Sequence, residues 1–287
     1  MVNVAGGDVD EWTGIEVDEW SGNDIDGITC LGQWGGAVSN GQAEVLHSRD
    51  RFVTRVSYTT ADLTAHPPND IDAASQSFIV VAADDGYIYV SRDGLTTCPT
   101  SLEGTITTEN LTGVEIAPSN RQVVYAWTSA DDIILKTENG GETWFQVATT
   151  GTGGTGITAL KVHHDNANLV LAATDAGEVF QSTDGGETWT EQADLIGMST
   201  KANVAINDID TVGGGVWFLA GTESGEFDRV YVNYEDGAGG AWEYFNPLDS
   251  ETYATTVEIK AIAAADPNRL VAVGGNDSDT LLVALLS

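Results

Sequence analysis

The chain has 287 residues, with 44 Asp and Glu against 11 Lys and Arg, and a formal net charge of −33. A surface of this sign repels phosphate backbones and anionic membranes, which excludes nucleic-acid binding; the absence of an 18-residue apolar run excludes membrane insertion. The acids are spread along the whole chain and screening by salt would relieve their repulsion, so the composition predicts a protein of a halophilic system rather than an acidic mesophile protein.

The first predicted element lies in an acidic segment at the start of the chain. Residues 6–22 read GGDVDEWTGIEVDEWSG, with Val-Asp-Glu-Trp twice. Two tryptophans argue against the alternative of a disordered arm, because disordered segments are poor in aromatic residues. We expect a strand over residues 8–17 and a linker to residue 22. The segment has neither a basic nor an apolar region typical of a secretory signal.

A repeat of about 46 residues follows. Strongly apolar strands start at Phe78, Val123, Leu169, Val216 and Leu270, at spacings of 45, 46, 47 and 54 residues. A preceding strand is marked by an aliphatic residue seven positions earlier, and two further strands flank a Gly-rich turn. Four-stranded repeats of 40–50 residues are typical of propeller blades, since a ring of blades covers both faces of every sheet.

We therefore predict a single all-β domain over residues 1–287, a six-bladed β-propeller of four-stranded antiparallel blades with almost no helix. The second strand of the first blade is expected at Leu31–Ala37. The last blade lacks its outer strand, and residues 8–17, with Trp12 as the packing residue, are predicted to supply it and close the ring. The predicted blades are residues 23–58, 69–107, 112–149, 157–194, 202–247, and 256–287 plus 8–17.

Two turns carry the pattern Ser/Thr-x-Asp/Asn-x-Gly-x-Thr-Trp. One consists of Thr137, Asn139, Gly141, Thr143 and Trp144, the other of Ser182, Asp184, Gly186, Thr188 and Trp189. A weaker copy has Ser91 and Asp93, but Leu and Cys replace its Gly and Trp. The pattern resembles the Asp-box, or BNR repeat, of the propellers of sialidases, sortilin-type receptors and photosystem assembly factors. The resemblance implies a structural role on the rim, because the acidic or amide side chain binds backbone N–H groups of its own turn.

The resemblance does not extend to the sialidase catalytic residues. That activity needs three arginines on different blades, and most of the seven arginines here fall at repeated turn positions. A glycosidase of another kind needs only two facing carboxylates, and no pair stands out among 44 acids. We expect no catalytic residues; a secreted or surface glycan hydrolase is the alternative.

Asn-Asp-Ile-Asp occurs three times, at 23–26, 69–72 and 207–210, in the strand predicted to lie nearest the propeller axis. Side chains alternate along a strand, so the residues at one position of successive repeats should all point toward an axial channel. These residues are Asp24, Asp70, Glu115 and Asp208, and in the fourth repeat the same position is Lys161. Converging carboxylates attract a divalent or monovalent cation. The alternative is a water-filled channel in which the carboxylates are solvated. No cofactor is otherwise expected.

These observations predict a non-enzymatic binding or structural propeller. The expected setting is a virion or an extracellular surface, as a structural or host-recognition component. The expected partners are other structural proteins or a cell-surface glycan or glycoprotein, and copies of the chain in an assembly. An intracellular assembly factor is a third hypothesis. The longest predicted loops, and therefore the expected contact surfaces, are residues 57–70, 149–156, 193–203 and 246–256.

Overall fold

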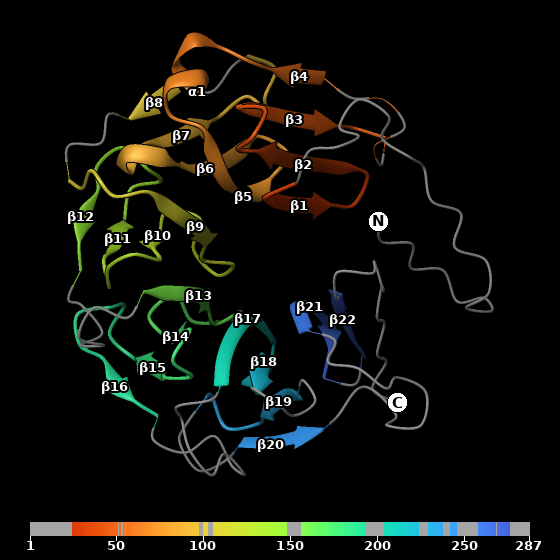
Figure 1. Ribbon diagram of the computed structural model, residues 1–287, viewed down its shortest axis with the longest axis vertical. Coiled ribbons are helices and arrows are strands. Elements are labelled where there is room, and N and C mark those ends of the chain that lie inside the picture. Colours follow the sequence, from red (N-terminus) through yellow and green to blue (C-terminus); the bar gives the residue numbers. More distant parts are fainter. Residues whose placement is uncertain are drawn as a thin grey trace.

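A computed structural model gives the fold, and Figure 1 shows sheets of antiparallel strands arranged around a common axis. The residues that the structure describes are 25–50, 52, 54, 56–97, 100–102, 106–147, 156–192, 204–223, 229–237, 242–245, 258–267 and 269–275. Within them, the helical elements are α1 (Ala61–Ala65) and the 3-10 turn η2 (Asp84–Gly86). None of the helices in this part of the chain is long and apolar enough to cross a bilayer.

The strands form six sheets, numbered here in chain order. Sheet 1 has β1 (Gly27–Leu31), β2 (Trp34–Ser39), β3 (Glu44–Ser48) and β4 (Val56–Tyr58); sheet 2 has β5 (Pro68–Ser75), β6 (Phe78–Ala83), β7 (Ile88–Ser91) and β8 (Thr100–Leu102); sheet 3 has β9 (Leu111–Ile116), β10 (Val124–Thr128), β11 (Ile134–Thr137) and β12 (Phe145–Gln146). Sheet 4 has β13 (Ile157–Val162), β14 (Val170–Thr174), β15 (Val179–Ser182) and β16 (Thr190–Glu191); sheet 5 has β17 (Val204–Val212), β18 (Val216–Glu223), β19 (Arg229–Asn233) and β20 (Trp242–Phe245); the described part of sheet 6 has β21 (Glu258–Asp266) and β22 (Arg269–Gly275).

The hydrophobic core lies between successive sheets. In β6, Ile79 and Val81 pack with Trp34 of sheet 1, while Val80 and Ala82 pack with Val114 of sheet 3. Similar clusters join sheets 3 and 4, 4 and 5, and 5 and 6. Side chains alternate across a strand, so a strand buried on both faces must be apolar throughout, which explains the continuous apolar runs that mark the second strand of each repeat.

The described residues form six antiparallel sheets, of which five are four-stranded, as the repeat predicts; the number of propeller blades stays a prediction. The proposed closing strand at 8–17, Trp12, and residues 276–287 lie outside the described part of the chain, so the closure stays a prediction.

Sheet 1 corrects two expectations. Its second strand begins at Trp34 rather than Leu31, and its first strand begins at Gly27, after the Asn-Asp-Ile-Asp motif that was expected within it. The helix α1 was also not expected. Thr60 caps it by accepting a hydrogen bond from the backbone N–H of Leu63, whose side chain is fully buried.

Candidate functional site at the axis

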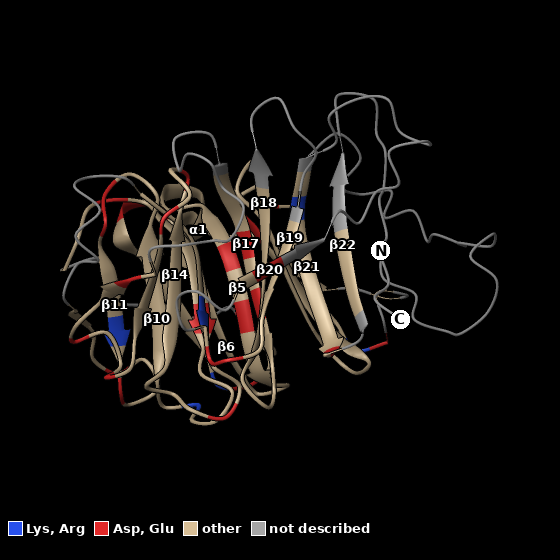
Figure 2. Ribbon diagram, turned by 90° about the horizontal axis from the view of Figure 1, so that it is seen from below, with Lys and Arg blue, Asp and Glu red and all other residues tan. Residues whose placement is uncertain are grey.

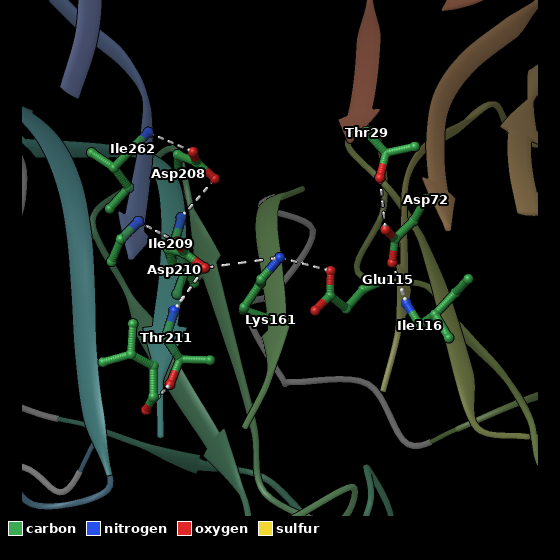
Figure 3. Close-up of polar contacts among 12 residues, drawn as sticks. Thr29, Asp72, Glu115, Ile116, Lys161, Asp208, Ile209, Asp210, Thr211 and Ile262 are labelled. Carbon is green, nitrogen blue, oxygen red and sulfur yellow. Dashed lines mark hydrogen bonds and ion pairs between the residues drawn. The ribbon is translucent and has the colours of Figure 1, made fainter. Parts of the chain in front are cut away.

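The innermost strands β1, β5, β9, β13, β17 and β21 surround the axis in Figure 1. The acidic residues of β5 and β17 form red bands on these strands in Figure 2. Figure 3 shows that their carboxylates do not project freely, since most of them contact a neighbouring strand.

The motif at 69–72 joins sheet 2 to sheet 3. Asn69 Nδ2 donates to the carbonyl of Leu111 at 2.9 Å, and Asp70 Oδ2 accepts from the backbone N–H of Val114 at 2.9 Å. Asp72 Oδ2 accepts from the backbone N–H of Ile116 at 2.8 Å. Three side chains of β5 thus satisfy backbone groups of β9 in the way that a neighbouring strand would.

The motif at 207–210 makes the same contacts from sheet 5 to sheet 6. Asn207 Nδ2 donates to the carbonyl of Ile259 at 2.7 Å. Asp208 and Asp210 accept from the backbone N–H groups of Ile262 and Ala264, at 2.8 and 2.7 Å. We call the contacts that such a motif makes with the next sheet an inter-sheet clamp. One clamp comes from residues 69–72 and the other from residues 207–210.

Of the motif at 23–26, the structure describes Ile25 and Asp26. Asp26 accepts from the backbone N–H of Asn40 within sheet 1 at 2.7 Å, and Asp24 lies outside the described residues. The side chain of Ile25 is 48% exposed. At the level of Asp70 sheet 1 has Gly27, whose backbone lies so close to Asp70 that an added Cβ would be 2.6 Å from Oδ1.

The strand registers correct the predicted ring of Asp70, Glu115, Lys161 and Asp208. Glu115 pairs with Tyr125 and Lys161 with Leu171, each the third residue of an apolar run, counted from Val123 and from Leu169; the partners of Asp72 and Asp210 are also third, counted from Phe78 and from Val216. The partners of Asp70 and Asp208 lie two positions farther along their apolar runs, at the same level as the partners of Gly113 and Ala159. Glu115 and Lys161 therefore share a level with Asp72 and Asp210, and these four residues are called the axial cluster.

Lys161 is the basic member of the axial cluster (Figure 3). Its Nζ lies 2.9 Å from Glu115 Oε2 and 4.0 Å from Asp210 Oδ1. Burial by itself would lower the pKa of Lys161, but Glu115, Asp210 and Asp72 outweigh it and raise the pKa. The lysine therefore stays protonated and compensates carboxylates from both neighbouring sheets.

Burial disfavours the charged forms of Asp70, Asp208 and Glu115 and so raises their pKa values. It raises the pKa of Asp70 to about 7 and that of Asp208 to about 6, although backbone N–H groups oppose the shift. Burial also raises the pKa of Glu115 to about 8, against the attraction of Lys161. These groups exchange protons in the neutral range, where general acids and bases work, but each is held by its neighbours.

In the described part of the chain, no three His, Cys, Asp or Glu side chains could together hold a metal ion; Asp24, the fourth predicted ligand, lies outside it, so the cation site stays a prediction. Asp70 and Asp208 bind backbone N–H groups, and Glu115 binds Lys161. The donors predicted to converge are thus separated into two levels and engaged, and we derive no role for a metal here.

The turns of the predicted Asp-box pattern are held by their own side chains. In the turn at 182–189, Ser182 Oγ contacts Asp184 Oδ1 at 2.8 Å and accepts from Gly186 N, while Asp184 accepts from Thr188 N at 2.9 Å and Thr188 Oγ1 at 2.6 Å. Hydrogen bonds from the Thr188 side chain and backbone lower the pKa of Asp184 to about 2. Trp189 packs against the cluster between sheets 3 and 4.

The other two turns follow the same scheme. Thr137 Oγ1 accepts from Gly141 N, Asn139 Oδ1 accepts from Thr143 N, and Trp144 packs between sheets 2 and 3. In the weaker copy Ser91 Oγ contacts Asp93 Oδ1 at 3.1 Å, and Leu95, in the place of glycine, adopts a φ of 56°.

The sequence did not predict that each of these turns is also held by the preceding sheet. Arg49 donates to the carbonyl of Gly94, Arg92 to that of Gly140 at 2.8 Å, and Tyr125 to that of Gly185 at 3.1 Å. Gln181 Nε2 donates to the carbonyl of Asp236 at 2.6 Å. The available signal was that Arg49 and Arg92 both directly follow the turn serine.

Comparison with known proteins supports the fold. A structure of YCF48 bound to D1 peptide is similar with a TM-score of 0.67, at 16% sequence identity over 88% of this chain and 75% of that chain. A structure of YCF48 from Cyanidioschyzon merolae is similar with a TM-score of 0.60, at 16% identity over 88% of this chain and 80% of that one. This chain has the β-propeller architecture of those proteins. No family model matches the sequence, and no curated protein matches it.

Proposed function

We propose that the protein is a non-enzymatic propeller that binds a segment of another protein. The observation that carries the proposal is the likeness to YCF48, a propeller of which one structure holds a peptide. The axial carboxylates and the turn residues of this chain act in the fold, holding neighbouring sheets and turns, which supports a binding role over hydrolysis.

The binding surface that we propose is the face carrying the connections between sheets. In a four-stranded antiparallel sheet, the turn between the first two strands and the turn between the last two lie at one end. The latter turns are held by the preceding sheet through residues such as Arg92. The connections to the next sheet lie at the opposite end, which includes α1 (Figure 2). Of the loops expected to make contacts, 57–70 contains α1; the ranges 149–155, 193–203 and 246–256 lie outside the described residues.

The chemistry of the partner follows from charge. A chain of net charge −33 repels acidic segments and attracts basic ones, and complementary charge sets the rate and specificity of association. We propose a partner segment rich in Lys and Arg, bound most strongly at low salt.

The test uses immobilised 15-residue peptides matched in length and hydrophobicity but differing in net charge, titrated with the purified protein at several salt concentrations. Saturable binding to particular basic peptides supports the proposal. The same preparation is assayed against a glycan panel. Cleavage of any glycosidic bond would overturn the non-enzymatic role in favour of the hydrolase, and binding of no peptide would overturn the partner class.

The setting is a separate proposal. Assembly of a larger protein complex is favoured by the YCF48 likeness, so we propose an assembly factor as one setting. A virion or extracellular structural component of a halophilic system is the other, based on the acidic composition. The two differ in whether the protein remains in the finished particle. Quantifying the chain in purified particles and in cell extracts distinguishes them.

A further inference from the structure

The axial cluster brings the side chains of four sheets to one level. Glu115 comes from β9, Lys161 from β13 and Asp210 from β17, and their side chains are 7%, 30% and 17% exposed. Asp72 of β5 contributes further negative charge, and acts on Glu115 and Lys161 from sheet 2. Like charges drawn together in a partly buried site repel strongly unless a cation lies among them.

The polar contacts of these acids show where the compensation comes from. Asp72 and Asp210 accept hydrogen bonds from the backbone N–H groups of Ile116 and Ala264, which are dipoles without net charge. Among the described residues, the ion pairs of Glu115 and Asp210 are both with Lys161. The balance of charge at this level therefore depends on one ammonium group.

We infer that the ammonium of Lys161 is a built-in counter-ion, which lies between carboxylates of sheets 3 and 5 and balances their charge, so that the junction of sheets 3, 4 and 5 needs no added cation. A resident ammonium differs from a bound ion in that dilution or chelation cannot remove it. It also fixes the carboxylates of sheets 3 and 5 to a side chain of the sheet between them. This role is independent of the proposed partner binding.

The test measures the thermal midpoint of the purified chain at pH 8.5, where Glu115 is largely ionised, in 1 M NaCl and in a buffer of equal ionic strength containing 5 mM CaCl₂. Lys161→Met keeps an unbranched chain of similar volume but removes the charge. We expect the midpoint to fall by roughly 5 to 15 °C, because Glu115 loses the ammonium that compensates it and must either stay charged without a partner or take up a proton on folding. We expect CaCl₂ to recover part of this loss while leaving the wild-type midpoint unchanged.

Two further variants separate charge from packing. Lys260→Met removes an exposed lysine of β21 and changes the net charge equally, so it measures the effect of losing one positive charge at the surface. Adding Glu115→Gln to Lys161→Met should restore much of the loss, because it removes the unpaired carboxylate. If Lys161→Met does not fold, the double variant decides: a folded double variant supports the counter-ion role and an unfolded one overturns it. The inference is also overturned if Lys161→Met behaves like Lys260→Met, or if CaCl₂ raises the wild-type midpoint as much as that of the variant.

Discussion

Replacing Asp70 by Asn tests how the buried acids of the inter-sheet clamps affect stability. The pKa of Asp70 is raised from 3.8 to about 7 in the folded protein. A raised folded-state pKa means that the stabilising contribution is fully present below pH 4 and is lost as the pH rises through about 7. A shift of about three pKa units corresponds to at most ~4 kcal/mol. Because the side chain is only half-buried, we expect about 1–2 kcal/mol between pH 5 and pH 8.

Asn at this position keeps a carbonyl oxygen for the N–H of Val114 but does not titrate. The free energy of unfolding of the wild type should therefore fall from pH 5 to pH 8, and the difference between the variant and the wild type should move in favour of the variant by about 1–2 kcal/mol. The measurement is urea unfolding followed by tryptophan fluorescence, at constant salt and half-unit pH steps. Subtracting the two curves cancels the contributions of Glu115 and Asp208. A difference that stays constant with pH would refute the reasoning.

Three other changes test different parts of the fold. Gly113→Ala should destabilise the protein by about 1–3 kcal/mol, because the new Cβ would lie 2.0 Å from Trp127 Cζ2. The control Gly41→Ala, whose new Cβ would have nothing within 4 Å, should leave urea unfolding nearly unchanged. Equal effects of the two variants would contradict the packing argument. Asp184→Ala should lower the free energy of unfolding by about 1 kcal/mol at pH 7. Because the pKa of Asp184 is lowered in the folded protein, the difference between the variant and the wild type should vanish as the pH falls through about 2. A loss of stability that persists in acid would point to packing instead. If residues 8–17 close the last sheet, removing residues 1–17, which include Trp12, should lower the thermal midpoint by roughly 5 °C or more. Removing residues 1–5 should leave the midpoint unchanged. An unchanged midpoint of the longer truncation would refute the closure.

The repeat and the turns could be predicted from the sequence because both depend on local chemistry. Strands buried on both faces must be apolar throughout, which makes the second strand of each repeat, such as the one from Phe78, easy to recognise. A turn held by its own Ser182 and Asp184 has its partners within a few residues, so spacing alone indicates it.

The register at the axis could not be predicted because the hairpins differ. The strands β5 and β6 pair from Ser75 and Phe78, with two residues between them, and β5 contains irregularities. The strands β9 and β10 pair from Ile116 and Val124 across a longer turn. Counting back a fixed number of residues therefore placed Glu115 at the level of Asp70, although it lies at that of Asp72.

The role of the repeated motif was also beyond the sequence. The Asp-rich motifs indicated carboxylates at the axis, and the structure places Asp70 and Asp208 there, but their partners are backbone groups more than forty residues away. A backbone N–H leaves no mark in the sequence, because every residue except proline has one. In the copy at 23–26, Asp26 accepts from Asn40, which directly follows β2 of the same sheet, whereas Asp72 and Asp210, at the same position of the motif, accept from the next sheet, so the motif by itself does not determine its partner.

The two inter-sheet clamps also affect how molecules behave toward one another at high concentration. The strands β9 and β21 are edge strands in the described parts of sheets 3 and 6, and an uncovered edge invites strands of other chains to add to it, which leads to fibres. Carboxylates of the preceding sheet occupy edge N–H groups of Val114, Ile116, Ile262 and Ala264. The clamps therefore leave no free N–H group at these positions with which a strand of another chain could pair.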